Sequence, residues 1–211
     1  MNDIRTQFQN LGVIPVVAIE RAQDAMPLAD ALIEGGLACA EITFRTSAAA
    51  EAMQTLAKRG DILVGAGTVL TTDQVDIALD AGARFIVAPG FNPRVAAYCV
   101  EKKVAFTPGI CTPSDIEAAL SYGLQMLKFF PAEAFGGLNT LKAMSAPYKA
   151  VEFIPTGGVN PQNLAEYLGF AKVIACGGTW IAKSGLISEG KFDQICKNAR
   201  EAAAIAKDFK K

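Results

Sequence analysis

One lysine in this sequence lies where lysines are rarely found, inside a run of apolar residues. Lys128 occupies the middle of Met126–Phe130, and strand alternation places its side chain on the same face as Phe130. A lysine removed from water loses part of its preference for the charged form, so a neutral and nucleophilic amine becomes available. The pattern therefore indicates a lysine that forms a Schiff base with a ketone. The alternative is a lysine that only pairs with a buried carboxylate.

A second apolar run carries its polar residues on one face only. A period of two aligns Glu41 with Arg45 on one face and Ile42 with Phe44 on the other. If the apolar pair packs against helices, Glu41 points into the interior as a candidate general base. Arg45 then lies at the end of the strand, where its guanidinium could bind a substrate carboxylate. A structural ion pair of Glu41 with Lys128 or Arg45 is the alternative.

Two Gly-Gly pairs lie about 20 residues apart, each at the end of an apolar run. Bare backbone N–H groups in such turns bind phosphate in parallel α/β proteins, and two ordinary glycine turns are the alternative. The residues of these two turns are Thr156, Gly157, Gly158, Gly177, Gly178 and Thr179. Thr68, which ends a glycine-rich run, and Pro89 are further candidate contacts at the ends of runs, where a ligand can approach the backbone closely.

The elements that must position these residues repeat along the chain. Eight apolar runs recur every 20 to 26 residues, and segments with helical periodicity lie between them. The runs are Val13–Ile19, Cys39–Thr43, Ile62–Ala66, Phe85–Ala88, Val104–Thr107, Met126–Phe130, Val151–Pro155 and Val173–Cys176. Capping residues followed by proline predict helix starts at Asn92-Pro93, Thr112-Pro113 and Asn160-Pro161.

Strands alternating with helices in this way predict a parallel sheet covered by helices. Eight such units favour closure into a (β/α)8 TIM barrel over an open doubly wound sheet. No linker interrupts the repeat, so residues 1–211 are expected to form a single compact domain. In this fold the active site lies at the carboxyl ends of the strands, where the candidate residues described above are found.

Composition narrows the classes of function. The chain of 211 residues is 51% hydrophobic and 19% charged, with a net charge of −1 and no basic cluster, which argues against nucleic acid or an anionic membrane as partner. Its longest apolar stretch covers about a third of the ~20 residues that a membrane span needs. The polar start of the chain shows no signal sequence, so a cytoplasmic location is expected. The five cysteines fit no disulfide framework, and the absence of histidine removes most metal sites and histidine-based nucleophile systems.

Taken in order, these motifs resemble the class I aldolases for 2-keto-3-deoxy-6-phosphogluconate (KDPG) and 4-hydroxy-2-oxoglutarate (KHG). The resemblance covers essentially the whole chain. The segments that carry it are Glu41-Ile-Thr-Phe-Arg45-Thr, Val-Gly-Ala-Gly-Thr68-Val-Leu, Pro89-Gly, Lys128-Phe-Phe-Pro-Ala-Glu133, Pro155-Thr156-Gly-Gly-Val and Gly177-Gly-Thr-Trp180.

The resemblance implies a homotrimeric (β/α)8 enzyme that needs neither metal nor cofactor. Its expected substrate is a small 2-keto-3-deoxy sugar acid phosphate, cleaved to pyruvate and glyceraldehyde 3-phosphate. Lys128 matches the Schiff-base lysine and Glu41 the general acid/base. The other matched positions bind the pyruvyl carboxylate (Arg45, Thr68), contact the substrate (Pro89), take part in stereochemical choice (Thr156) or bind phosphate (Gly157, Gly158, Gly177, Gly178, Thr179). Phe130 joins the candidate substrate contacts, and Thr179 stands where relatives often have serine.

Three other functions compete with this one. A 2-dehydro-3-deoxy-6-phosphogalactonate aldolase would use the same residues on a related substrate. A sugar-phosphate isomerase or epimerase on the same barrel would share the glycine turns but would not need a lysine inside a strand. A non-catalytic sugar-acid-phosphate binding protein would bind its ligand reversibly. The residues do not decide which keto acid is preferred or whether it must be phosphorylated.

Overall fold

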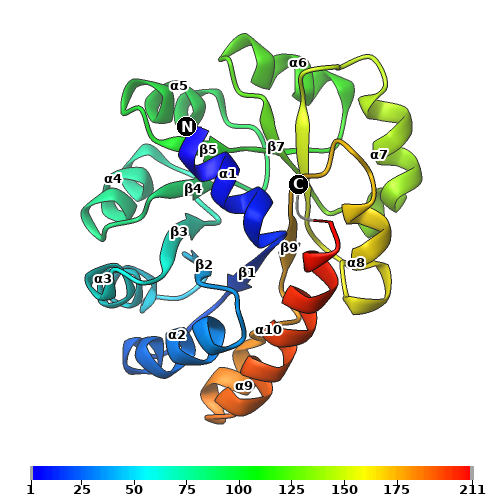
Figure 1. Cartoon of the computed structure of the whole chain (residues 1–211). Coiled ribbons are helices and arrows are strands. Elements are labelled where there is room, and N and C mark those ends of the chain that lie inside the picture. Colours follow the sequence, from blue (N-terminus) through cyan, green and yellow to red (C-terminus); the bar gives the residue numbers. More distant parts are fainter. Residues whose placement is uncertain (1, 210–211) are drawn as a thin grey trace.

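Strands and helices alternate along almost the whole chain in the computed structural model, which describes residues 2–209 (Figure 1). The strands are β1 (Val13–Val17), β2 (Cys39–Thr43), β3 (Leu63–Gly67), β4 (Phe85–Val87), β5 (Ala105–Thr107), β6 (Gly109–Ile110), β7 (Met126–Phe129), β8 (Glu152–Pro155) and β9 (Cys176–Gly178). The helices are α1 (Asn2–Leu11), α2 (Ala25–Glu34), α3 (Ala49–Arg59), α4 (Thr72–Asp80), α5 (Pro93–Glu101), α6 (Pro113–Ser121), α7 (Gly137–Ser145), α8 (Pro161–Leu168), α9 (Ser184–Ser188) and α10 (Phe192–Lys207). Two short 3-10 helices, η1 (Ala22–Asp24) and η2 (Glu133–Phe135), precede α2 and α7.

All strand pairs are parallel, and the helices cover the outside of the curled strands (Figure 1). The α/β class and the parallel sheet predicted from the sequence are therefore confirmed. The hydrogen-bonded ladders form two sheets, one in the order β5-β4-β3-β2-β1-β9 and one in the order β6-β7-β8. One continuous eight-stranded ladder is thus not formed.

Pro108 is the physical reason for the break between the two sheets. It stands between β5 and β6 and has no N–H group to donate to a neighbouring strand. Its carbonyl still accepts a hydrogen bond of 2.8 Å from the backbone N–H of Lys128. The single predicted run Val104–Thr107 is therefore followed by a separate strand, β6, that the sequence pattern did not predict.

The last strand also lies further along the chain than predicted. The run Val173–Cys176 was expected to form it, but β9 begins at Cys176 because register with β1 pairs Val13 with Cys176 and Pro15 with Gly178. Val173 contributes only an isolated bridge to Phe153 of β8. Glycines weaken the sequence signal for a strand, although their backbone groups pair as well as any other.

The three predicted helix starts are confirmed by their caps. The side chain of Asn92 accepts hydrogen bonds from the amides of the first turn of α5. Thr112 and Asn160 form reciprocal capping boxes at the starts of α6 and α8. Each cap satisfies amides that the helix itself leaves unpaired, so the two-residue signal of a capping residue followed by proline was sufficient.

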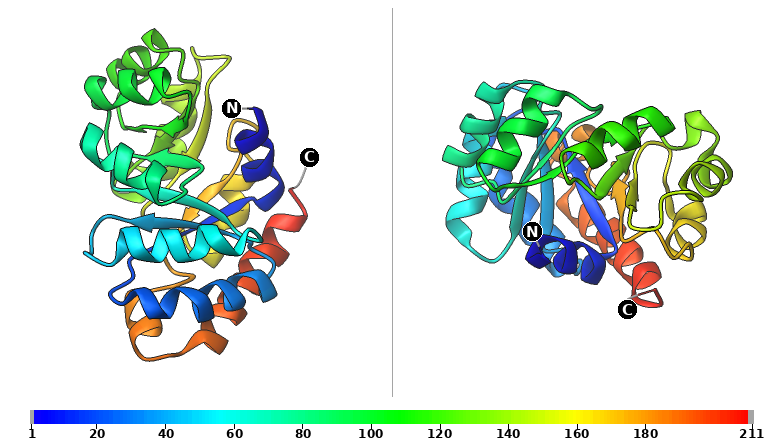
Figure 2. Two further views of the ribbon diagram at one scale, coloured as in Figure 1. Left: turned by 90° about the vertical axis from the view of Figure 1, so that its left-hand side faces the viewer. Right: turned by 90° about the horizontal axis from the view of Figure 1, so that it is seen from above.

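Two apolar layers enclose the strands. The larger lies between the strands and the helices, and the smaller fills the inner side of the curled sheets. The inner layer receives Ile4 and Phe8 from α1, which lies across the amino ends of the strands (Figures 1 and 2). The Phe8 ring meets the Phe85 ring edge to face, with centroids 4.8 Å apart. The polar start of the chain is thus an amphipathic helix that closes one end of the inner layer.

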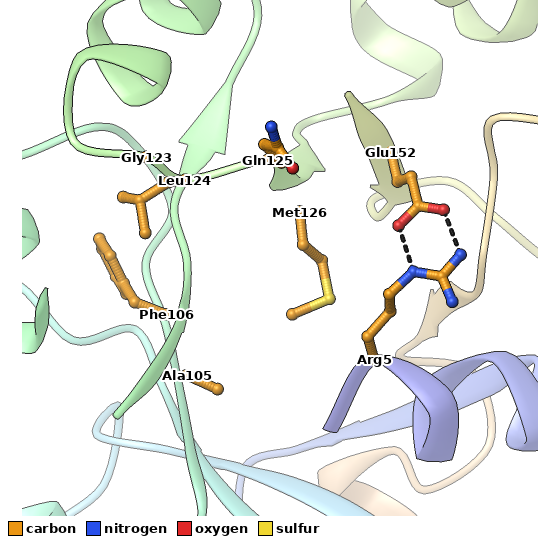
Figure 3. Close-up of a pocket in the computed structure, with 8 residues that line it drawn as sticks. All are labelled: Arg5, Ala105, Phe106, Gly123, Leu124, Gln125, Met126 and Glu152. Carbon is orange, nitrogen blue, oxygen red and sulfur yellow. Dashed lines mark hydrogen bonds and ion pairs between the residues drawn. The ribbon is translucent and has the colours of Figure 1, made fainter. Parts of the chain in front are cut away.

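A cavity of about 390 Å³ lies beside α1, at the amino ends of β5, β7 and β8 (Figure 3). One wall is the paired Arg5 and Glu152, whose Nε and Oε2 atoms are 2.6 Å apart, and Met126 lies next to them. Every polar group that Figure 3 shows on this wall is already paired. The cavity is also at the opposite end of the strands from the candidate catalytic residues, so it is not the candidate active site.

We expect Arg5→Ala to lower the free energy of unfolding by about 1 kcal/mol, because it removes a bidentate ion pair that links α1 to Glu152 of β8. The effect stays modest because both side chains keep contact with solvent. Urea denaturation measures it, with the exposed Arg94→Ala on α5 as a matched control. Equal stability of the two variants would show that the pair contributes nothing.

Within residues 2–209, each helix is too short or too polar to cross a bilayer. The same part of the chain contains no group of three or more potential metal ligands among its cysteines and carboxylates.

Candidate active site

The predicted amine and the predicted carboxylate meet inside the curled strands. Lys128 extends from β7 and Glu41 from β2, and their Nζ and Oε1 atoms are 3.4 Å apart. The two residues are only 6% and 4% exposed. Each charge lies beside the opposite charge, which offsets part of the cost of burying both groups. The contact is an ion pair, and the same contact would place a base beside the amine, so the two interpretations left open by the sequence do not exclude each other.

Glycine in β3 makes room for the carboxylate. A Cβ atom at residue 67 would lie 2.1 Å from Oε1 of Glu41, so any side chain there would displace it. Gly65 has the same role for the ring of Phe85, since a Cβ atom there would lie 2.1 Å from that ring. The glycine-rich strand was predicted to admit a ligand close to the backbone. Its glycines Gly65 and Gly67 admit two side chains of the protein, and the predicted ligand contact at Thr68 stays a prediction.

Arg45 is oriented by a hydroxyl group that the sequence analysis did not select. The buried Thr43 donates a hydrogen bond of 2.7 Å from Oγ1 to the carbonyl of Val17 and accepts one of 3.0 Å from Nε of Arg45. Arg45 forms no ion pair with Glu41 or any other residue in the described chain, so its terminal nitrogens remain free to bind an anion. Thr43 lies between Glu41 and Arg45 on the same face of the strand. Its position in this alternating pattern is the sequence feature that could have identified it.

Three further candidates lie at neighbouring strand ends. Thr68 follows β3 with a φ angle of +56°, a left-handed conformation that is unusual for threonine and is often found at functional sites. Phe130 follows β7, and its ring centroid is 5.4 Å from Nζ of Lys128. Pro89 follows β4, and its carbonyl oxygen packs against Gly109, in the space that a side chain at residue 109 would need. Only Phe130 among these three contacts Lys128 in the described structure.

The two glycine turns come together at the ends of β8 and β9. Thr156 is buried, and a bridge pairs it with Gly177. A Cβ atom at residue 177 would lie 2.2 Å from Oγ1 of Thr156, so this glycine accommodates the threonine hydroxyl. Gly157 and Gly158 have φ angles of +94° and +84°, which few residues other than glycine adopt.

The second turn is more tightly packed than the first. Gly178 is buried against Ile181, Val13 and Trp180, and a Cβ atom there would lie 2.7 Å from Cδ1 of Ile181. Thr179, the next residue, is exposed. Its side chain is therefore accessible to solvent.

Comparison with known proteins decides the family. The model of the KDPG and KHG aldolase family matches residues 4–198. This chain belongs to that family. The 2-dehydro-3-deoxy-phosphogluconate aldolases of Treponema pallidum and Haemophilus influenzae are 48% and 44% identical to it; the alignments cover 94% and 95% of this chain, and 95% of each relative.

Solved structures of family members superpose closely. The KDPG aldolase of Zymomonas mobilis with 3-phosphoglycerate has a TM-score of 0.92 and 38% identity, covering 97% of both chains. The KDPG aldolase of Legionella pneumophila, with pyruvate captured as a covalent carbinolamine intermediate, has a TM-score of 0.89 and 37% identity, covering 92% of this chain and 95% of that one. The resemblance expected from the sequence motifs is confirmed.

The cysteines of this family member offer no competing nucleophile. All five are free, and four of them are buried. Burial raises the pKa of the Cys39 and Cys176 thiols and raises that of Cys99 to about 12. A thiol held protonated in this way reacts poorly, because the thiolate is the nucleophilic form. The pKa values of the Cys111 and Cys196 thiols are raised as well, so Lys128 stays the candidate nucleophile for covalent chemistry with a ketone.

Proposed function

We propose that this protein is a class I aldolase that cleaves 2-dehydro-3-deoxy-6-phosphogluconate to pyruvate and glyceraldehyde 3-phosphate. We include 4-hydroxy-2-oxoglutarate, cleaved to pyruvate and glyoxylate, as a second substrate. The observation that carries the proposal is the buried amine of Lys128, 3.4 Å from the carboxylate of Glu41. The activities of the Treponema, Haemophilus and Zymomonas relatives support the substrate, and the carbinolamine in the Legionella relative supports the covalent step.

The proposed chemistry needs one amine and one carboxylate. The neutral amine of Lys128 adds to the C2 ketone, and the resulting carbinolamine loses its hydroxyl group as water to leave a protonated imine. Glu41, directly or through one water molecule, removes the proton of the C4 hydroxyl. The C3–C4 bond then breaks, its electron pair moves to the iminium to form an enamine, and the aldehyde leaves. Glu41 returns a proton to C3, and hydrolysis of the imine releases pyruvate.

Arg45 selects 2-keto acids in this proposal. Its guanidinium lies at the carboxyl end of β2, held by Thr43, on the strand that also supplies Glu41. A carboxylate bound there would place the adjoining ketone toward Lys128, which supplies orientation as well as affinity.

We expect Arg45→Ala to raise the KM for keto acids and the dissociation constant of pyruvate about 10- to 100-fold, as loss of a charged hydrogen bond to a carboxylate predicts. The value of kcat should fall much less. Steady-state kinetics and pyruvate titration measure the two effects, and Arg200→Ala on α10 is the control. Unchanged affinity in Arg45→Ala would remove Arg45 from the substrate site.

Gly157 and Gly158 are proposed to bind the phosphate group. The carbonyl of Gly158 is already used, because it accepts hydrogen bonds of 3.1 and 3.2 Å from the side-chain amides of Asn160 and Asn163. The backbone N–H groups of both glycines form no hydrogen bond with the described part of the chain. Consecutive unpaired amides of this kind form a concave anion site. Gly177, Gly178 and Thr179 complete the proposed phosphate loops, and Thr68, Pro89, Phe130 and Thr156 complete the proposed substrate contacts.

We also propose that residues 1–211 form one domain with the strands arranged as a closed (β/α)8 barrel. Two observations support closure. The bridge between Thr156 and Gly177 joins β8 to the end of the six-stranded sheet, and the hydrogen bond from Lys128 to Pro108 joins its other end to β7. Homotrimeric assembly and a cytoplasmic location are proposed on the family resemblance alone.

Borohydride trapping tests the proposed function directly. The protein is incubated with pyruvate, treated with borohydride and analysed by mass spectrometry, and a single reduced adduct on Lys128 is expected. An unmodified protein would instead favour a sugar-phosphate isomerase, an epimerase or a non-catalytic binding protein. Initial rates with the gluconate- and galactonate-derived substrates then decide between the two aldolase activities.

A further inference from the structure

The glycine turn after β8 is held from one side by the segment that follows β7. The backbone N–H of Ala132 donates a hydrogen bond of 2.8 Å to the carbonyl of Thr156, and that of Glu133 donates one of 3.0 Å to the carbonyl of Gly157. With the carbonyl of Gly158 also occupied, three successive carbonyls of the turn accept hydrogen bonds from the protein. The orientation of the Gly157 and Gly158 amides therefore depends on where η2 places residues 132 and 133.

The side chain of Glu133 supports the same turn. A Cβ atom at residue 158 would lie 2.4 Å from Cγ and 2.5 Å from Cβ of Glu133, so the aliphatic part of this side chain packs directly against Gly158. Its Oε1 atom accepts a short hydrogen bond from the hydroxyl of Tyr167. Glu133 thus spans the distance between the glycine turn and helix α8.

Tyr167 is a fixed donor for this contact. It extends from α8, is only 1% exposed and is packed in the outer apolar layer. Burial, together with the hydrogen bond to Glu133, raises the pKa of its phenol, so the hydroxyl stays protonated over the physiological range. The buried ring of Tyr167 cannot move without disrupting the core. Its hydroxyl therefore holds the carboxylate of Glu133 in one position.

The negative charge of Glu133 makes the position of its carboxylate important for anion binding. Glu133 is exposed and lies beside the turn whose free amides are proposed to bind phosphate. A carboxylate free to rotate over that turn would repel a phosphate or compete with it for the amides. Tyr167 holds the carboxylate against α8, while the methylene groups of Glu133 still support Gly158.

We propose that Tyr167 and Glu133 are positioning residues that set the preference for phosphorylated substrates. Tyr167 fixes Glu133, and Glu133 fixes the Gly157-Gly158 turn in the conformation that binds phosphate. The inference rests on the proposed function, because it assigns the selectivity of the same site. Neither residue touches the reacting atoms in this proposal.

Tyr167→Phe is the test, since it removes one oxygen atom and keeps the buried ring. We expect the KM for the phosphorylated substrate to rise about 5- to 10-fold, as loss of one hydrogen bond to a charged group would predict. The KM for 4-hydroxy-2-oxoglutarate and both kcat values should stay within twofold. Tyr148→Phe is the matched control, because it removes a tyrosine–glutamate hydrogen bond of 3.1 Å to Glu117, away from the turn.

Inorganic phosphate gives a second readout that does not need catalysis. A ligand that binds only the folded protein raises its Tm, and we expect phosphate to do so in the wild type and in Tyr148→Phe but much less in Tyr167→Phe. Should Tyr167→Phe not fold, Glu133→Ala removes the same hydrogen bond by changing the exposed partner. The same KM values and the same phosphate-induced shift in Tm are then measured for Glu133→Ala.

The outcomes separate this inference from the proposed function. If Tyr167→Phe raises the KM of both substrates equally, or changes neither KM nor the phosphate-induced shift in Tm, the pair has no role in selectivity. A wild type that phosphate stabilises but that cleaves neither keto acid would contradict the proposed function. In that case a smaller thermal shift in Tyr167→Phe would still support the role of the pair in binding phosphate.

Discussion

Lys128→Met should lose at least about 1,000-fold in kcat and form no borohydride adduct with pyruvate, because the variant keeps the length of the side chain but has no nucleophile. Methionine fits the apolar surroundings that Phe130 and the inner layer provide. A coupled assay of pyruvate release measures turnover, and mass spectrometry measures the adduct. Undiminished cleavage by this variant would rule out a Schiff-base mechanism on Lys128.

The variant also leaves Glu41 buried without its partner, so its stability has to be followed separately. Removing one partner of a buried ion pair costs about 3–5 kcal/mol. Lys128→Arg is the matched control, since it keeps the positive charge beside Glu41 but supplies no free amine at neutral pH. Both variants should be inactive, and only Lys128→Met should unfold at clearly lower urea concentration. Activity in a well-folded Lys128→Arg would exclude the lysine amine as nucleophile.

Glu41→Gln is expected to separate covalent binding from turnover. The amide can still accept a hydrogen bond from Lys128, so borohydride should continue to trap a pyruvate adduct. It cannot take or return a proton, and loss of general acid/base catalysis predicts a fall in kcat of about 100- to 10,000-fold. The exchange of pyruvate methyl protons for deuterium, followed by NMR, reports the second proton transfer and should fall in parallel.

Glu152→Gln serves as the control for this second experiment, because Glu152 lies at the opposite end of the strands, beside Arg5. It should exchange and cleave at wild-type rates. If Glu41→Gln kept normal turnover, the general base would have to be another group. If it lost turnover but exchanged methyl protons normally, Glu41 would serve only the step at the C4 hydroxyl.

Local patterns predicted much of this fold and its site. Alternation placed Glu41 and Lys128 opposite the apolar residues Ile42 and Leu127, and the packing of those two residues in the outer layer makes the face of Glu41 and Lys128 the inner one. Helix starts such as Thr112-Pro113 were equally predictable, since a cap is formed by residues within one turn of each other. The family motifs added the order of these elements along the chain.

Contacts between distant segments were not predictable in the same way. Nothing local indicates that α1 covers the inner layer with Ile4 and Phe8, because the surface that it covers comes from several strands. The space at Gly67 is filled by Glu41 from a neighbouring strand, a contact that the sequence of β3 alone does not indicate. The link from Arg45 through Thr43 to Val17 depends in the same way on the pairing of β1 with β2.

The separation of the two reacting groups along the chain has a consequence for biosynthesis. Glu41 and Lys128 are 87 residues apart and meet only inside the assembled strands. A ribosome-bound fragment that ends before β7 holds the carboxylate without the amine, and a proteolytic fragment that begins after β2 holds the amine without the carboxylate. Synthesis from the amino terminus therefore supplies the carboxylate before the amine, so no nascent chain carries the amine of Lys128 without Glu41.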